Sequence, residues 1–386
     1  MLRASHAIYL AVIALLGTAL IMVHSARMQV GSGPGFDLVA AAQDRYVIHA
    51  LVALLALVVA SRIDVRQFDR CRGWSNPLWW LFVLAVGLVV LAMVPGVGRS
   101  VHGARRWLTV GPASWGVSFQ PSEVVKWIMV VAIAWWCARR RDEMRRFWKG
   151  SVPALLLASG AAALIAVEDL GTGLLVAMVA WTLVLAGGAR LWHLACLVPP
   201  AAAAVALGVI AFPYRMNRLI AFANPWQDPA GIGYHPIQSM RAIADGGLLG
   251  RGLGNGVAKL GYLPEDTTDF LFAVICEEMG VFGAALVVGL LLVLIWAGYA
   301  VIRSAADPFS RLFALGVVLT VGYQALINIA VVTVVVPTKG IALPLISAGG
   351  TGWIMTAAAL GLLAALDRAR RLETEPQVGC VAKDGV

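Results

Sequence analysis

The chain has 386 residues, of which 60% are hydrophobic and only 13% are charged, and its mean hydropathy is +0.82 with a formal net charge of +9. Soluble globular proteins carry about 25% charged residues, so this composition excludes a water-soluble fold. It indicates a chain that has lipid as its main solvent.

Ten apolar runs predict membrane-spanning helices, because about 20 apolar residues cross the roughly 30 Å of hydrocarbon in a bilayer. In chain order the runs are 7–23, 46–60, 77–94, 127–138, 151–167, 170–187, 191–212, 270–302, 312–336 and 351–366. The run 270–302 is long for one span, so we expect it to be tilted or to extend beyond the bilayer. No clear cleavage site follows the first run, so we expect that run to be kept.

Lys and Arg residues orient the predicted helices, because they accumulate on the cytoplasmic side of a membrane. With the N-terminus inside, the inner segments hold 18 of the 30 Lys and Arg residues and the outer segments hold 11. Both termini are therefore expected in the cytoplasm. We interpret the basic run 139–149 as an anchor on anionic lipid headgroups, and we expect no nucleic-acid partner.

Three long outer segments carry most of the polar residues, namely 95–121, 213–268 and 336–350. Long connections are uncommon unless they are functional. We expect one integral membrane domain, 1–386, that includes 213–268 as a large extracytoplasmic loop and 367–386 as a cytoplasmic tail. The glycine-rich stretch 246–256 lacks the strand and the GK[ST] sequence of a phosphate loop, so it is predicted to be a flexible outer loop.

Two pairs of charged residues begin predicted spans. Glu123 and Lys126 are three residues apart, so they share a helix face and are expected to pair inside the membrane. That pair is either purely structural or the wall of a polar cavity that binds a charged headgroup. Glu168 and Asp169 are either helix caps or site residues, since acids are stabilised at a helix N-terminus.

The sequence GARRW places Arg105 and Arg106 beside Trp107. Arginine binds phosphate through a two-pronged guanidinium, so this pair suits a phosphate group, whereas the tryptophan is alternatively an interfacial anchor. Lys339, in PTKG, adds a further cation on the same predicted side.

The sequence LPEDTTDF places Glu265, Asp266 and Asp269 just before a long apolar run. Its two threonines are predicted to cap the helix that follows. Glu277 and Glu278 lie deeper, and the spacing of eight residues predicts that Glu277 shares a face with Asp269. Buried anions are costly, so we expect Arg or Lys residues of the outer segments to approach them.

Seven motifs occur in order between about residues 77 and 366: GARRW, QPSEVVK, DLGTG, GIGYHPIQS, GGLLGRGLGNGVAK, LPEDTTDFLFAVICEEMG and PTKGIALPLISAGG. Together they resemble the SEDS family (shape, elongation, division and sporulation). PTKG looks more like the division members, whereas GYHPIQS leans toward the elongation members. The resemblance implies an all-α polytopic fold of about ten helices, similar to the lipid-dependent glycosyltransferases of the GT-C type.

The resemblance also implies an activity, a location and partners. The activity is polymerisation of lipid II into peptidoglycan strands, with release of undecaprenyl pyrophosphate, in the bacterial cytoplasmic membrane. The partners are a class B penicillin-binding protein and other division or elongation membrane proteins. Two alternatives stay open, a lipid II flippase and a non-catalytic division scaffold.

The family's essential acid falls on Asp269, which we expect to be the catalytic base. The residues expected to bind substrate are Arg105, Arg106, Trp107, Gln120, Glu123, Lys126, Asp169, Gln238, Ser239, Glu265, Lys339 and Ser347. Among them, the cations expected at the pyrophosphate are Arg105, Arg106, Lys126 and Lys339. Burial beside other acids raises the pKa of an aspartate and nearby arginines lower it, and the sequence leaves the balance at Asp269 open.

Three departures from the family pattern stand out. Thr267 replaces a histidine, Ala348 replaces a tyrosine and Glu168 replaces a proline. They bear on the level of activity and on the choice of partner, and they spare the predicted base.

No cofactor is predicted with certainty. The five cysteines are scattered without a CxxC pair, so we expect neither a disulfide framework nor a cysteine metal site; they are Cys71, Cys137, Cys196, Cys276 and Cys380. A divalent cation, Mg²⁺ or Mn²⁺, is compatible with pyrophosphate chemistry, but the sequence assigns no ligand cluster to it.

Overall fold

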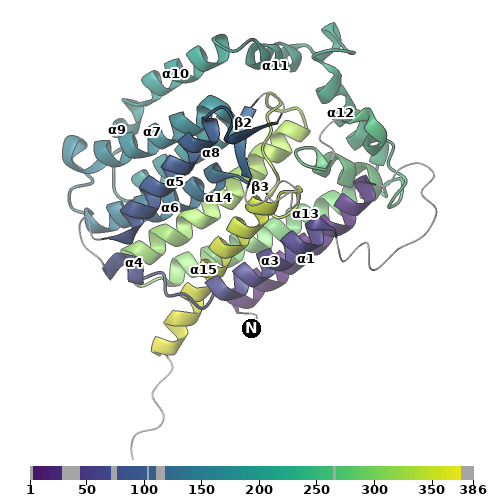
Figure 1. Ribbon diagram of the computed structural model, residues 1–386. Coiled ribbons are helices and arrows are strands. Elements are labelled where there is room, and N and C mark those ends of the chain that lie inside the picture. The colour runs from purple at the N-terminus through teal and green to yellow at the C-terminus, as the bar shows by residue number, and fades with distance from the viewer. Residues whose placement is uncertain are drawn as a thin grey trace, which may run out of the picture.

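The computed structural model describes residues 3–27, 44–70, 76–101, 104–109, 118–263 and 267–374. The helices, shown in Figure 1, are α1 (Ala4–Ala26), α3 (Arg45–Ala60), α4 (Gln67–Arg70), α5 (Pro77–Met93), α6 (Pro121–Arg139), α7 (Val152–Glu168), α8 (Leu170–Ala186), α9 (Leu191–Ala195), α10 (Val198–Ile210), α11 (Pro213–Ala223), α12 (Tyr234–Gly246), α13 (Leu271–Ser304), α14 (Pro308–Val332) and α15 (Gly350–Thr374). Shorter helices are η3 (Phe147–Ser151), η4 (Pro225–Gln227) and η5 (Ala258–Tyr262). The predicted site residue Glu265 lies outside the described residues, as do Asp266, Cys71 and Cys380.

All ten predicted spans coincide with apolar helices. Within the described ranges, seven helices are long and apolar enough to cross a membrane, and α3, α5 and α8 are shorter apolar helices. The first described residues and the end of α15 lie at the same end of the bundle (Figure 1), as an even number of spans requires. The prediction of a polytopic helical membrane protein is confirmed.

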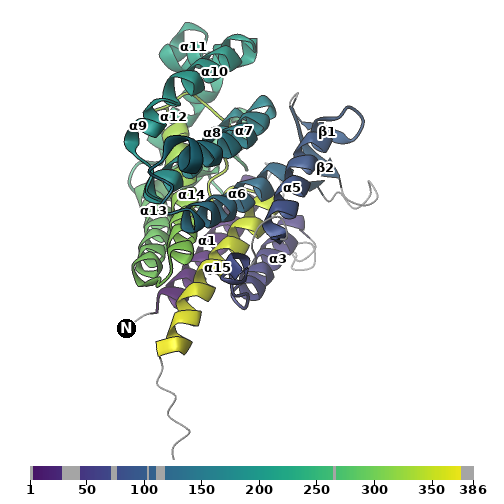
Figure 2. The ribbon, with the colours of Figure 1, turned by 90° about the vertical axis from the view of Figure 1, so that its left-hand side faces the viewer.

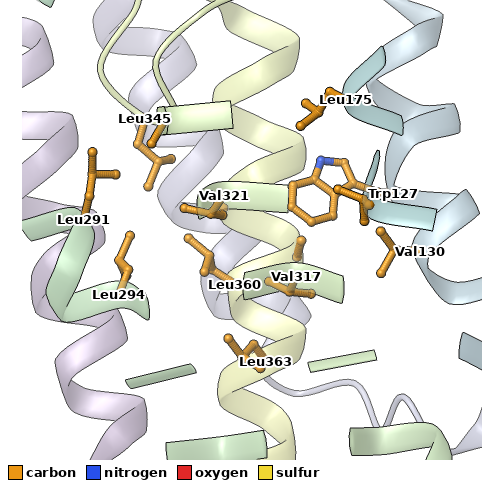
Figure 3. Close-up of a cluster of buried hydrophobic side chains, with 14 of the residues drawn as sticks. Trp127, Val130, Leu175, Leu291, Leu294, Val317, Val321, Leu345, Leu360 and Leu363 are labelled. Carbon is orange, nitrogen blue, oxygen red and sulfur yellow. The ribbon is translucent and has the colours of Figure 1, made fainter. Parts of the chain in front are cut away.

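The core lies where α6, α8, α13, α14 and α15 meet. Figure 3 shows side chains of this core, which come from all five helices and from the segment before α15: Trp127, Val130, Leu175, Leu291, Leu294, Val317, Val321, Leu345, Leu360 and Leu363. These side chains are buried against side chains of neighbouring helices and do not only face lipid. They therefore hold the helices in place around α14.

A small antiparallel sheet occupies the predicted outer segment 95–121. Its strands are β1 (Gly98–Val101), β2 (Ala104–Thr109) and β3 (Ser118–Phe119), in the order β1-β2-β3. The sheet lies at the end of the bundle away from the N-terminus, here called the distal end (Figure 2). The sequence did not predict it, because within β2 only Leu108 is buried and the strand therefore lacks a clear alternation of apolar and polar residues.

The segment 213–268 is largely helical, not an irregular loop. The helices α11 and α12 cross the distal end of the bundle (Figure 1), and η4 and η5 follow them in the connections. Both α11 and α12 mix polar and apolar residues, so neither forms an apolar run in the sequence.

Helix α13 is broken at Gly280, which has φ +61° and ψ −154°. The break separates a segment 271–279, here called the half-helix, from a continuous helix over 281–304. Every residue from 271 to 278 is buried. The apolar run is therefore long because it contains a buried half-helix and a break before the membrane-spanning helix. The sequence predicted a tilted or protruding helix instead, and it did not predict the break.

We expect Gly280→Ala to destabilise the protein by about 1–3 kcal/mol, because this backbone region is nearly restricted to glycine. An added Cβ would also lie 2.5 Å from both the Gly250 nitrogen and the Leu248 oxygen. Thermal unfolding in detergent measures the effect. Gly289→Ala is the matched control in the same helix, since nothing lies within 4 Å of its Cβ position. Alanine favours a helix over glycine, so an equal loss of stability in both variants would contradict the explanation.

Candidate functional site

A cavity of about 1100 Å³ lies at the distal end, and it brings together segments that are far apart in the sequence. The sheet, α6, the junction of α7 and α8, α11, α12, the turn before α13 and the segment before α15 all contribute to it. Seven predicted site residues line it: Arg106, Trp107, Gln120, Glu123, Asp169, Asp269 and Ser347.

Asp269 lies in the turn that leads into the half-helix. Its backbone oxygen accepts a hydrogen bond from Asn328 Nδ2 at 2.9 Å, and the same nitrogen donates to the Ile341 oxygen at 2.7 Å. A Cβ at Gly340 would lie 2.6 Å from Asp269 Oδ2. The carboxylate can therefore lie this close to the backbone only because residue 340 is a glycine. Phe270 occupies the N-cap of α13, so neither threonine caps it as predicted.

The predicted pair of Glu123 and Lys126 is present. Lys126 Nζ donates to Glu123 Oε2 at 2.7 Å and to Gln324 Oε1 at 3.0 Å. Glu123 lines the cavity, whereas the Lys126 side chain is only 2% exposed and lies behind it. Lys126 therefore positions the acid, and we do not retain it as a cation for pyrophosphate.

Asp169 is both a helix cap and a cavity residue. Its Oδ1 accepts from the Thr172 backbone nitrogen at 3.0 Å, which caps α8, and its Oδ2 accepts from Thr172 Oγ1 at 3.0 Å. Arg106 Nη1 lies 3.3 Å from Asp169 Oδ2, and Arg106 Nε donates to the Glu168 oxygen at 2.9 Å. The two interpretations of this motif are therefore compatible, and Arg106 is fixed at the cavity wall.

Several predicted residues lie away from the cavity. Arg105 faces a separate small pocket of about 20 Å³, and its backbone nitrogen donates to Glu168 Oε2 at 2.8 Å. Ser239 is buried and donates to the Val332 oxygen at 2.6 Å, while Gln238 is not among the cavity-lining residues. Membership of a motif did not indicate which side chains face the cavity.

Other cavity residues were not predicted. Helix α11 contributes Tyr214 and Arg218, its N-cap residue Phe212 lines the cavity too, and α12 contributes His235, three residues before Gln238. The signal for Arg218 was present, because it is one of the cations of the long outer segment. Nothing in the sequence showed that α11 lies across the cavity.

Lys339 lies next to Gly340 and close to the cavity cations. Burial lowers the pKa of Lys339 from its ordinary value; the Asp169 carboxylate opposes this, whereas Arg215 and Arg218 lower the pKa further. These interactions place Lys339, Arg218 and Asp169 in one electrostatic neighbourhood. Arg106, which pairs with Asp169 at 3.3 Å, belongs to the same neighbourhood.

Glu277 and Glu278 do not share a face with Asp269, because Asp269 precedes the helix and the two glutamates lie at the far end of the half-helix. They bind the glycine-rich segment 246–256 and the residues that follow it. This segment is therefore held in place, whereas the sequence predicted a flexible loop. Lys259 Nζ lies 2.7 Å from Glu278 Oε1, and Arg251 Nη1 lies 3.6 Å from Glu277 Oε1. The prediction that cations approach these acids is confirmed.

The glycines of this segment allow close backbone contact with α13. A Cβ at Gly246 would lie 1.8 Å from the Cys276 oxygen, and one at Gly250 would lie 2.2 Å from the Glu278 oxygen. Backbone N–H groups of Gly254 and Gly256 do bind an anion, as in a phosphate loop, but the anion is the chain's own Glu278 carboxylate.

Two of the departures from the family pattern are neighbours. The Ala348 backbone nitrogen donates to the Thr267 oxygen at 2.9 Å, and Ala348 lines the cavity beside Thr268 and Asp269. Both large side chains of the family pattern are therefore missing from one place next to the predicted base.

Within the described residues, no group of three or more His, Cys, Asp and Glu side chains converges. Cys137, Cys196 and Cys276 are free thiols.

Comparisons with known proteins agree with this architecture. A chain from a solved structure of a peptidoglycan synthase complex that coordinates polymerization and crosslinking aligns with a TM-score of 0.72 at 26% identity, covering 94% of this chain and 97% of that one. The rod shape determining protein RodA of Thermus thermophilus aligns with a TM-score of 0.66 at 24% identity, covering 94% of this chain and 96% of that one, and so supports the fold.

Two similar proteins from bacteria have the same name. A probable peptidoglycan glycosyltransferase FtsW of Alkalilimnicola ehrlichii is 38% identical over 95% of this chain and 90% of that protein, and one of Coxiella burnetii is 36% identical over 92% and 94%. The family model of cell cycle proteins that comprises FtsW, RodA and SpoVE matches residues 6–372. This chain therefore belongs to the FtsW, RodA and SpoVE family of cell cycle proteins.

Proposed function

We propose that this protein is a peptidoglycan glycosyltransferase that polymerises lipid II and releases undecaprenyl pyrophosphate, and that it acts in cell division. The names of the curated relatives support the activity. The observation that carries the proposal is the placement of Asp269 in one cavity with Arg106 and Arg218, with Lys339 beside it.

The reaction needs a base. A sugar hydroxyl of one substrate attacks the anomeric carbon of the other, forming a C–O bond while the bond from that carbon to the pyrophosphate oxygen breaks. Asp269 takes the proton of the attacking hydroxyl, and the electron pair of the broken bond leaves with the pyrophosphate. Gly340 leaves the space in which the carboxylate lies.

The departing pyrophosphate needs positive charge. Arg106 is held by Asp169 and by the end of α7, so its guanidinium is preorganised at the cavity wall. Fixed cations aimed at charge that develops in the transition state lower the barrier without reorganisation. Arg218 and Lys339 add to the same field.

The proposed location is the bacterial cytoplasmic membrane, with the distal end outside and both termini in the cytoplasm. The distribution of Lys and Arg supports this orientation. The likeness to a peptidoglycan synthase complex supports a partner of the class B penicillin-binding type, which would crosslink the strands.

The test is reconstitution of the purified protein with lipid II and its penicillin-binding partner, followed by detection of glycan polymer. Polymer that forms only when the protein is present supports the proposal. Movement of labelled lipid II across vesicles without polymer would instead support a flippase. Neither activity, together with normal division in cells that carry Asp269→Asn, would support a scaffold.

Arg218→Ala is expected to raise the KM for lipid II about tenfold, because a cation that faces a pyrophosphate contributes more than 1 kcal/mol as a charged hydrogen bond. The measurement is the polymerisation rate as a function of lipid II concentration. Arg241, which is exposed on α12 and does not line the cavity, supplies the control variant Arg241→Ala. An equal rise in both variants would point to a general charge effect.

Lys339 gives the site a pH dependence. Because its folded pKa is lowered, mainly by burial, the ammonium loses its proton at a lower pH than an ordinary lysine does. The charged form is disfavoured in the folded protein, so stability increases as pH rises through the folded pKa, while anion binding weakens. We expect the KM for lipid II to rise with pH in this range, and to stay flat in Lys339→Arg, since arginine keeps its charge. A parallel rise in the arginine variant would assign the effect to another group.

A further inference from the structure

The half-helix 271–279 is held at both ends. At its first end, Asn328 fixes the backbone of Asp269 through a hydrogen bond of 2.9 Å. At its other end, Glu277 and Glu278 are each about 1% exposed and bind groups from outside α13. Gly280 then breaks the helix, so the direction of the half-helix is not set by the membrane-spanning helix 281–304.

Glu278 has a complete set of partners. Ser25 Oγ of α1 donates to it at 2.7 Å, the Gly254 and Gly256 backbone nitrogens donate at 3.1 and 3.3 Å, and Lys259 Nζ donates at 2.7 Å. Lys259 also donates to Ser25 Oγ at 3.0 Å and to the Gly254 oxygen at 2.8 Å. Three parts of the chain therefore meet at one carboxylate: α1, the glycine-rich segment and the half-helix.

Glu277 extends this network. The Val257 and Ala258 backbone nitrogens donate to its carboxylate at 2.8 and 3.1 Å. The Arg251 nitrogen donates to the Glu277 oxygen at 2.9 Å, which satisfies a carbonyl at the end of the half-helix. Here the clamp means Ser25, Lys259, Glu277 and Glu278.

Stability alone does not explain the clamp. Anions are disfavoured at the C-terminal end of a helix, where the macrodipole is negative. The attraction in a buried ion pair is largely offset by desolvation, so apolar side chains of similar volume would stabilise this place as well. What a set of directional hydrogen bonds adds is a defined orientation of the half-helix.

That orientation determines where Asp269 lies. A half-helix of nine residues is about 13 Å long, so a tilt of about 5° at the clamp moves the opposite end by about 1 Å. A displacement of about 1 Å at a reacting group can reduce turnover about 10²-fold. We propose that Lys259 and Glu278 are positioning residues that hold Asp269 at the reacting hydroxyl; the inference rests on the proposed role of Asp269 as the base.

The experiment uses the full chain with its penicillin-binding partner and lipid II. Glu278→Asp keeps the charge and shortens the reach by one methylene, and the double variant Glu278→Gln, Lys259→Met removes both charges but keeps the lengths. Glu143→Asp makes the same change in an exposed ion pair outside this region, Arg140–Glu143 at 3.4 Å, and is the matched control. The measurements are kcat and KM, normalised to the folded fraction, and the melting temperature.

We expect Glu278→Asp to lower kcat at least tenfold while KM stays within about twofold, and the control to keep both values. A clamp that only stabilises the fold would lower the melting temperature and leave the normalised kcat unchanged, which would overturn the inference. Should the buried variants not fold, Ser25→Ala removes one donor and leaves the ion pair, and its normalised kcat decides in the same way.

The two proposals fail differently. A wild-type protein that forms no polymer would overturn the proposed function and this inference with it. A wild-type protein that polymerises lipid II and requires Asp269, with clamp variants at wild-type kcat, would overturn the inference alone.

Discussion

Asp269→Asn is expected to lower glycan polymerisation by about 10²–10⁴-fold, the usual contribution of a positioned general base. Asparagine preserves the shape of the side chain and leaves the backbone contact from Asn328 unaffected, so the fold is expected to persist. The measurement is polymer formation from lipid II by the purified variant, together with its melting temperature in detergent.

Two further variants make this result interpretable. Asp245→Asn removes a carboxylate from an exposed position outside the cavity and is expected to retain wild-type activity. Asp269→Glu keeps a base but moves it by one methylene, so an intermediate rate is expected. A folded Asp269→Asn variant with the wild-type rate would show that another group accepts the proton.

Glu123→Ala is expected to lower the free energy of unfolding by about 3–5 kcal/mol, because it leaves a buried ammonium without its anion. The Lys126 side chain is 2% exposed, and its other hydrogen-bond partner, the Gln324 amide at 3.0 Å, carries no charge. Unfolding in detergent measures the loss. The double variant Glu123→Ala, Lys126→Met is expected to recover a large part of it, since no unpaired charge then remains.

The chain offers a control pair with the same spacing in the sequence. Arg140 and Glu143 are also three residues apart, with Nη1 3.4 Å from Oε2, but both side chains are more than 40% exposed. Exposed pairs contribute about 0–1 kcal/mol, so Glu143→Ala is expected to have little effect. Similar losses from the two glutamates would mean that burial is not the cause.

The spans were predictable because the signal for a membrane helix is local. A continuous apolar run needs no knowledge of its neighbours, and all ten runs became helices. The pairing of Glu123 with Lys126 was predictable for a similar reason, because a spacing of three residues fixes two side chains on one helix face.

The internal division of α13 was not predictable in this way. An apolar run does not reveal that residue 280 has a positive φ, because glycine is also common inside ordinary membrane helices. The glycine-rich segment was interpreted as flexible, whereas each of Gly246 and Gly250 permits a contact with a backbone that is distant in sequence. Such contacts exist only once both segments are in place.

The cavity shows the same limit. Motifs identified Arg106, Glu123 and Asp269, but they also pointed to Ser239, which is buried against Val332, and they missed Arg218. Whether a polar side chain faces a cavity depends on how its helix is rotated and on what covers it, and neither is encoded in a single motif.

The sequence by itself determined that this is a membrane protein with ten apolar runs, because apolar length is a local property. Its resemblance to a known family then pointed to one acid before the eighth span as the candidate base. Only the tertiary structure decided which cations share the cavity with Asp269 and how the half-helix that follows it is oriented. These depend on contacts of α11 and of the glycine-rich segment with distant parts of the chain, since hydrogen bonds and charges act over distance in space, whatever the separation in sequence.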